Sequence, residues 1–368
     1  MSASPRESRI LQMAPWFGEE ERAAVAEYME SGGWFTEFSK TREFEQAIAA
    51  FTGSPHAIAV TSGTAALFCA LSACGIGPGD EVLVPAFTMV ATANAVLLAG
   101  ATPVFVDIHP ANLCMDLDAA GQAVTERTRA ILLVSLNGRA PDMTRALSFA
   151  SRHSLKLIED AAQSLGSTQA GKALGSFGCA GAYSFGPLKI ISTGQGGAVV
   201  TADEKIAQRL RRFKDFGRER GGVDVHESIG YNFKFTDLQA AVGVAQMRKL
   251  AWRVERKKEI FALYREELRG APGIRFLDTD LAEVTPWFID ILTDRRDDLR
   301  RRLSEAGIEA RPFYPPVHLQ PAYRWKGRFP AAEEASARGL WLPSSSFLSD
   351  AEIGRVCAVI RAWAGLNG

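Results

Sequence analysis

AYSFGPLKIISTGQGGAVV, residues 182–200, places one lysine between two small-residue turns and ends in an apolar run. The Ser184–Phe185 pair before Lys189 and the TGQGG after it predict a tight, glycine-rich bend instead of a regular element. A lysine held on such a bend can be desolvated in a pocket and can act as an amine nucleophile toward a carbonyl. Most lysines are solvated surface residues, so this interpretation needs support from the rest of the chain.

Short apolar runs alternate with helical patterns throughout the first two hundred residues. Because these runs are apolar on both faces, they predict a mostly parallel, doubly wound sheet with helices on either side, an α/β fold. The predicted strands are 56–60, 81–85, 102–107, 129–136, 155–160 and 197–200. The predicted helices are 19–31, 41–51, 89–99 and 142–153, together with one that begins at the SGT turn, 62–64.

Polar residues follow several of these strands. Ligands of such sheets bind outside the carboxyl ends of the strands, where Asp160, Ser62–Thr64, Phe87–Met89 and Asn137 all fall. The edge therefore gathers a carboxylate, a helix start whose amides suit a phosphate, and the turn that carries Lys189. The SGT turn and Asp160 could also serve only as ordinary helix caps.

The pattern changes after residue 200. A basic helix, 204–216, and a polar, glycine-rich loop, 217–230, precede an alanine-rich helix and a long charged helix that starts at residue 253. We place a boundary near residue 250, between a large domain with an N-terminal arm (1–250) and a smaller C-terminal α+β domain (251–368). The later elements are a strand at 285–292, a helix at 296–306, a proline-rich loop at 311–318 and a closing helix at 350–364.

Composition excludes several classes of function. The 368 residues include 42 basic and 42 acidic side chains, and a net charge of zero argues against general binding to nucleic acid or to a membrane surface. No apolar run has the length of a membrane helix, and residues 1–12 lack the apolar core of a signal peptide. The five histidines form no HExxH pattern, so the sequence predicts no metal site.

The five cysteines are odd in number and form no CxxC pair. They are Cys69, Cys74, Cys114, Cys179 and Cys357. We interpret them as reduced core residues of a cytoplasmic protein.

Seven segments together resemble the DegT/DnrJ/EryC1/StrS aminotransferases, pyridoxal-phosphate enzymes that mostly aminate keto sugars carried on nucleotides. The resemblance spans nearly the whole chain and implies a fold-type I aminotransferase with residues 1–250 as the cofactor-binding domain. The segments are SGTAAL (62–67), PAFTMVATANAV (85–96), FVDI (105–108), IEDAAQSLG (158–166), YSFGPLKIISTGQGGAVVT (183–201), GYNFKFTDLQAAVG (230–243) and RPFYPPVH (311–318).

The resemblance implies roles for the residues around Lys189. Lys189 would carry pyridoxal 5'-phosphate as a Schiff base. Asp160 would pair with the pyridinium nitrogen, which keeps the ring an electron sink. Gln163 would meet the cofactor's phenolic oxygen.

The resemblance also implies a phosphate site. The amides of Thr64 and Ala65 and the Ser184 hydroxyl would hold the phosphate, and Asn232 would reach it from a neighbouring subunit, which implies a homodimer with active sites at the interface. Met89 stands where the family usually stacks an aromatic ring on the cofactor. The alternatives are a turn role for Ser184 and Asn232 and a core-filling role for Met89.

The implied reaction is a double displacement. An amino acid, expected to be L-glutamate, would leave its amino group on the cofactor as pyridoxamine 5'-phosphate, and a nucleotide keto sugar would then accept it, giving ping-pong kinetics. Trp34, Arg311, Tyr314 and His318 are candidates for sugar binding. A purely structural proline-rich loop is the alternative for the last three.

Four departures from the family pattern fall in or near the site segments. Besides Met89, Gln195 replaces the usual Glu of TGEGG, Phe38-Ser39 replaces Gly-Pro, and Ser135–Gly138 replaces His-Leu-Tyr-Gly. Two of these lie in loops expected to face the substrate, so the sequence does not name the sugar. One alternative is a sugar dehydratase of this fold, which would carry His at the lysine position, so Lys189 argues against it. The other is a non-catalytic regulator that keeps the fold and binds the cofactor, against which the retention of Lys189, Asp160, Gln163 and Ser184 argues.

Overall fold

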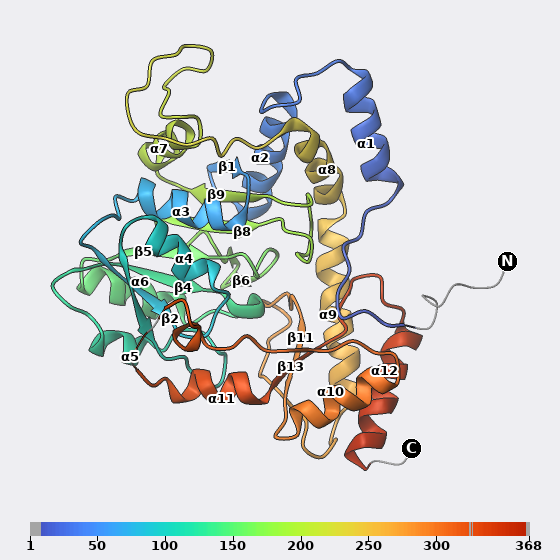
Figure 1. The fold of residues 1–368 in the computed structure, drawn as a ribbon. Coiled ribbons are helices and arrows are strands. Elements are labelled where there is room, and N and C mark those ends of the chain that lie inside the picture. Colours follow the sequence, from blue (N-terminus) through green and yellow to red (C-terminus); the bar gives the residue numbers. More distant parts are fainter. Residues whose placement is uncertain (1–8, 324, 326, 366–368) are drawn as a thin grey trace.

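A seven-stranded sheet forms the centre of the computed structural model, which describes residues 9–323, 325 and 327–365 (Figure 1). Residues 1–8, part of the stretch examined for a signal peptide, lie outside the described residues. The strand order is β1 (His56–Val60), β9 (Gly197–Thr201), β8 (Ala180–Ser184), β5 (Lys156–Asp160), β4 (Thr128–Val134), β2 (Glu81–Pro85) and β3 (Thr102–Val106). Only β9 runs antiparallel to its neighbours within this sheet, so the predicted, mostly parallel α/β fold is confirmed.

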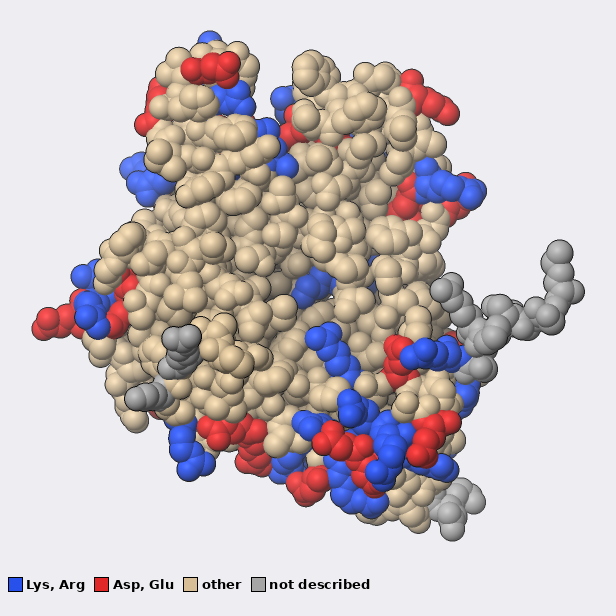
Figure 2. Space-filling view, viewed as in Figure 1, with Lys and Arg blue, Asp and Glu red and all other residues tan. Residues whose placement is uncertain are grey.

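A smaller antiparallel sheet follows later in the chain. Its order is β10 (Arg275–Phe276), β11 (Ile289–Leu292), β13 (Gly339–Leu342) and β12 (Arg311–Pro312). The helices packed near it are α9 (Leu250–Glu267), α10 (Arg296–Glu305) and α12 (Asp350–Ala364). Figure 2 shows that charged side chains of both signs gather over α10 and α12, while the centre of that face carries few.

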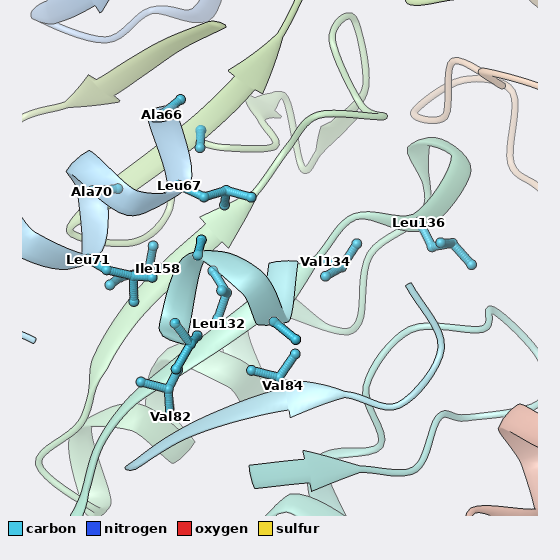
Figure 3. Packing of buried hydrophobic residues seen from close by; sticks show 14 of the residues in the cluster. Ala66, Leu67, Ala70, Leu71, Val82, Val84, Leu132, Val134, Leu136 and Ile158 are labelled. Atoms are coloured by element: carbon cyan, nitrogen blue, oxygen red, sulfur yellow. The ribbon is translucent and has the colours of Figure 1, made fainter. Parts of the chain in front are cut away.

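Helices cover both faces of the large sheet. One face carries α3 (Gly63–Ala73), α4 (Ala91–Leu98) and α7 (Glu204–Lys214), and the other α2 (Ser39–Thr52), α5 (Leu117–Gln122), α6 (Met143–Arg152) and α8 (Asp237–Arg248). Figure 3 shows Leu67 and Leu71 of α3 above Val82, Leu132 and Ile158 of the strands. Burying these branched side chains supplies the main stabilisation of the sheet, roughly 1.5–3 kcal/mol for each one.

The expected boundary near residue 250 falls where α8 ends and α9 begins, and it stays a prediction. The first described residues cross toward the later part of the chain, because Ile10 forms a backbone bridge with Ile308 and is buried. Among the described residues, no helix combines the length and apolar character needed to cross a bilayer.

The structure differs from the sequence expectations in several short elements. The proline-rich loop begins as a strand, because Arg311 and Pro312 pair with Trp341 and Leu340. Within α2, Phe44 and Ile48 are buried, whereas Phe51 near its end is 38% exposed. The first helix, α1 (Glu19–Glu30), ends one residue earlier than predicted. The sequence analysis did not predict α5, β6 (Thr168–Gln169), β7 (Lys172–Ala173), β8, β10, α11 (Pro330–Arg338), β13 and the 3₁₀ turns Leu136–Gly138 and Val317–Leu319.

Candidate active site

Asp160 lies at the carboxyl end of β5, as predicted, and is buried. One carboxylate oxygen accepts a hydrogen bond of 2.8 Å from the Thr92 hydroxyl, and the other accepts the Ala162 main-chain N–H at 3.2 Å. Burial raises the pKa of Asp160, while these donors and the charge of Lys189 oppose the rise. This carboxyl is therefore held in place and would be stabilised as an anion by a cationic partner.

Lys189 lies on the connection between β8 and β9, where its main-chain N–H donates to Gly186 O at 3.1 Å. Its amine is 3.8 Å from the centre of the Trp287 ring. The Trp287 indole N–H donates to Leu188 O at 2.7 Å, which fixes the ring beside the lysine. Burial lowers the pKa of Lys189 to about 8, although the charge of Asp160 opposes the shift. A much larger fraction of this amine is therefore neutral, and nucleophilic, than in a solvated lysine.

A small cavity joins the predicted residues. Its lining includes Gln163, Ser184, Lys189, Thr285 and Trp287. The structure thus brings together Gln163 from one predicted segment with Ser184 and Lys189 from another.

Gln163 is oriented by a neighbouring loop. Its Oε1 accepts the Asn137 main-chain N–H at 2.8 Å. Asn137 adopts a left-handed φ of 53° and bonds the backbone of Phe288 through both ends of its amide. This network connects the edge of the large sheet to the segment that precedes β11.

The start of α3 meets Ser184, as a phosphate site would require. A Cβ at Gly63 would lie 2.9 Å from the Ser184 hydroxyl oxygen, and a Cβ at Gly197 would lie 2.4 Å from Ser62 O, so glycine is needed at both positions. Ser62 caps α3 by accepting the Ala65 N–H at 3.1 Å. Ser62 therefore caps the helix and occupies the Ala65 amide, one of the two amides predicted to hold the phosphate. The first four N–H groups of a helix have no intrahelical acceptor, which leaves the Thr64 amide open to a ligand.

Three other predicted residues lie outside the cavity lining at Lys189. Met89 is 46% exposed in the turn between β2 and α4. Trp34 is 71% exposed between α1 and α2. Asn232 is exposed beside Tyr231, and its backbone bridges Asp215.

The proline-rich segment places its predicted residues in different surroundings. Arg311 is exposed, with its guanidinium 5.7 Å from the Tyr314 ring. Burial raises the pKa of Tyr314, and the charge of Asp160 adds to the rise while Arg311 opposes it. His318 is buried against Phe329, with Nε2 3.4 Å from a Glu333 carboxylate oxygen.

An open hollow of about 940 Å³ is lined by the residue that precedes Lys189 in the sequence. Leu188, the neighbour of Lys189, lines it together with Arg300, Arg301 and Arg311. Arg301 pairs with Asp298, and Arg300 has no ion pair within 4 Å in the described part of the chain. The carboxylates of Asp297, Glu305 and Glu309 line the same hollow, so its charge is mixed, and Arg300 and Arg311 are the guanidinium groups that could meet an anionic molecule.

The sequence analysis missed two residues of this site. Thr92 lies one helical turn after Thr88, and the two hydroxyls are 2.9 Å apart, so the TMVAT motif already contained the signal. Trp287 is far from Lys189 in the sequence. The sequence analysis placed it in the predicted strand 285–292 but gave no sign that it contacts Lys189.

The comparison with known proteins decides the family. The model of the DegT/DnrJ/EryC1/StrS aminotransferase family matches residues 15–361. The chain belongs to the DegT/DnrJ/EryC1/StrS aminotransferase family. The predicted resemblance is confirmed, and the chain is a pyridoxal-phosphate-dependent aminotransferase of the fold expected for it.

The relatives of this aminotransferase include sugar-modifying enzymes. It is 36% identical to the GDP-perosamine synthase of Caulobacter vibrioides over 96% of the chain and 97% of that protein. It is 38% identical to the dTDP-3-amino-3,4,6-trideoxy-alpha-D-glucose transaminase of Streptomyces venezuelae over 93% of the chain and 91% of that protein. The crystal structure of S. venezuelae DesV in complex with a ketimine intermediate superposes with a TM-score of 0.90, at 38% identity over 94% of both chains.

Proposed function

We propose that this aminotransferase moves an amino group from L-glutamate to a keto sugar carried on a nucleotide. The observation that carries the proposal is the amine of Lys189, whose pKa is lowered to about 8, in one cavity with Gln163 and Ser184. Two relatives are named for amino sugars linked to GDP or dTDP, which supports a substrate of that class.

The residues fit the cofactor that the family uses. Ser184, which lies against the start of α3, and the first amides of that helix would form a cradle for its phosphate. Asp160 is a buried carboxyl with a raised pKa whose charge acts on Lys189, and Lys189 would offer the amine for covalent attachment. When bound, pyridoxal phosphate supplies an electron sink that makes the donor's α hydrogen acidic. Asp160 would hold a proton on the ring nitrogen, and that cation would in turn favour the charged carboxylate.

Lys189 would have a second task as a base and an acid. With a pKa near 8, its amine can accept the proton from the donor's α carbon and return it at neutral pH. The Trp287 ring, 3.8 Å from the amine, would keep water from this position. Such a positioned base contributes on the order of 10²–10⁴-fold to rate.

The hollow beside Leu188 is the place we assign to the anionic part of the substrates. Arg311 lies on it and has no ion pair within 4 Å in the described residues. Trp34 and Tyr314 would contact the sugar or its carrier, whereas His318 is buried against Phe329 and Glu333 and would act through the loop that it anchors. An Arg311→Ala variant with an unchanged KM for the nucleotide sugar would remove Arg311 from this assignment.

A second copy of the chain would complete the site. The loop between α7 and α8, which projects from the molecule in Figure 1, exposes Val225, Ile229 and Tyr231 immediately before Asn232. Apolar side chains gathered on one exposed loop are typical of an interface. We therefore propose a homodimer in which Asn232 reaches the partner's phosphate site. We also propose that the enzyme is located in the cytoplasm. If the protein sediments as a monomer at micromolar concentration, the proposed homodimer is wrong.

The experiment that tests the proposed function follows the first half-reaction. The holoenzyme is mixed with L-glutamate, and 2-oxoglutarate release and the absorption spectrum are recorded. Stoichiometric release without a sugar present is expected, and parallel lines should appear in initial-rate plots with both substrates. Intersecting lines would exclude a double displacement, and no release would favour the dehydratase or regulator alternatives.

A further inference from the structure

Two cysteines lie in contact at the end of α3 that is remote from the active site. The sulfur atoms of Cys74 and Cys179 are 3.2 Å apart, although 105 residues separate them in the chain. Cys74 is the C-cap of α3, and Cys179 immediately precedes β8. All five cysteines are free thiols, and this pair is less buried than Cys69, Cys114 and Cys357.

The surroundings of the pair favour one ionised sulfur. Either sulfur can donate the hydrogen bond between them, and with Cys74 as the donor this bond lowers the pKa of Cys179 and raises that of Cys74. When it is protonated, the Cys179 thiol can instead donate to the Leu157 main-chain oxygen at 3.1 Å. The charge of Lys156 also favours the thiolate of Cys179, and Arg209 donates to Ala73 O, one residue before Cys74, at 3.1 Å. Oxidant-sensitive cysteines are thiolates with partial access, near positive charge and beside a second cysteine.

We propose that Cys74 and Cys179 form a reversible disulfide under peroxide, which clamps α3 to β8. A disulfide needs a sulfur–sulfur distance of about 2.05 Å, so the two atoms must approach by roughly 1 Å. The backbone of Cys179 is held by hydrogen bonds to Leu157 O and from the Thr201 hydroxyl, so the approach falls mainly to Cys74, which lies at the end of α3.

The chemistry needs hydrogen peroxide as the oxidant. The Cys179 thiolate attacks one peroxide oxygen, the O–O bond breaks and hydroxide leaves, which gives a sulfenic acid on Cys179. The Cys74 sulfur then attacks the Cys179 sulfur, the S–S bond forms and the S–O bond breaks, and the departing hydroxide takes the Cys74 proton. Overall, two thiols lose two electrons and two protons, and one peroxide becomes two waters.

The disulfide would raise the stability of the folded state and leave the aminotransferase activity unchanged. Gly63 and Ser184 mark the opposite end of the same α3–β8 contact, where a Cβ on Gly63 would meet the serine. The cross-link therefore fastens the outer end of this layer without entering the cavity at Lys189. Closing a loop of this length in the unfolded chain stabilises the folded state, and the melting temperature should rise by roughly a few °C.

The test uses the holoenzyme treated with hydrogen peroxide and digested without reductant. We expect a linked pair of peptides containing Cys74 and Cys179, a raised melting temperature that dithiothreitol reverses, and unchanged aminotransferase activity. Cys74→Ser should lose the link and the rise, while the matched control Cys69→Ala, on the same helix, should keep both.

Three results would overturn the proposal. They are a wild-type digest with no linked peptide, a Cys179 oxidised to the sulfinic acid without a link, and a link that leaves the melting temperature unchanged or removes activity. The peptide map of the wild type decides the first two without any variant, so a variant that fails to fold leaves the test intact.

Discussion

Lys189 and Lys257 are two lysines with lowered pKa in different parts of the molecule. Burial lowers the pKa of Lys189 to about 8 and that of Lys257 to about 7. Lys257 lies within α9, where its amine donates to the main-chain oxygen of Ser344. Lys189 instead lies on a turn, over an aromatic ring and beside a cavity. A lowered pKa thus reflects burial, and access to a cavity separates a candidate nucleophile from a structural lysine.

Lys214 shows what a buried lysine does when it has partners. Its amine lies 2.9 Å from Glu37 and 3.1 Å from Glu45. Although burial opposes the ammonium, the two carboxylates raise its pKa. A buried lysine is therefore a candidate base at Lys189, an amine bonded to a main-chain oxygen at Lys257 and the cation of a charged cluster at Lys214.

The largest expected effect separates Lys189 from Lys257. Lys189→Ala should reduce turnover by at least about 10³-fold, since it removes both the attachment point and the proton carrier. Lys257→Met, which removes an amine of similar pKa, should leave the half-reaction with glutamate intact. The rate of 2-oxoglutarate release and a circular dichroism spectrum check activity and fold. Equal losses in both variants would remove the distinction between the two sites.

The next effect concerns the charged cluster. Lys214→Met leaves Glu37 and Glu45 without their buried cation, and breaking such a group costs about 3–5 kcal/mol of the free energy of unfolding. Urea denaturation at neutral pH measures it. The exposed Lys205 on the same helix offers a matched control, and Lys205→Met should change stability by less than about 0.5 kcal/mol. A similarly small change in the free energy of unfolding for Lys214→Met would show that the buried charged cluster does not stabilise the folded state.

Lys257 should make stability depend on pH in one direction. Its pKa is about 7 in the folded state and roughly 10.4 when unfolded, so the unfolded chain binds more protons between those values. The free energy of unfolding should therefore rise by on the order of a few kcal/mol as the pH increases from 7 toward 10. Lys257→Met should be more stable than the wild type at pH 7, and this advantage should shrink toward pH 10. A pH-independent difference between the two proteins would contradict the folded-state pKa.

The smallest effect sharpens the role of the ring beside Lys189. Trp287→Phe keeps an aromatic face near the amine and loses the hydrogen bond to Leu188 O. We expect turnover to fall by roughly tenfold or less, the equivalent of about 1.4 kcal/mol for one neutral hydrogen bond. The pH at which the half-reaction rate rises should stay near 8, as the amine remains buried. A rate equal to the wild type would make the ring a packing residue only.

The sequence allowed the large sheet and its ligand edge to be predicted, because β1–β5 are apolar runs and Asp160 ends one of them. It did not allow β8 to be predicted, since AGAYS consists mainly of small residues that carry little strand signal. The segments around Gln163, Ser184 and Lys189 were identified by resemblance to a family, and their convergence in one cavity needed the structure. The Trp287 and Cys74–Cys179 contacts join residues about a hundred positions apart, which no local pattern encodes.

The antiparallel pairing of β8 with β9 limits where this chain tolerates change. Ser184 pairs with Gly197, so the segment that carries Lys189 leaves the sheet and returns to it at directly facing positions. Adding or deleting one residue of β9 would turn every later side chain of that strand to the opposite face. The exposed segments around Trp34 and Arg311, which we propose to contact the sugar, carry no such register constraint on this sheet. The length of the segment 185–196 is therefore fixed by the strands on either side of it.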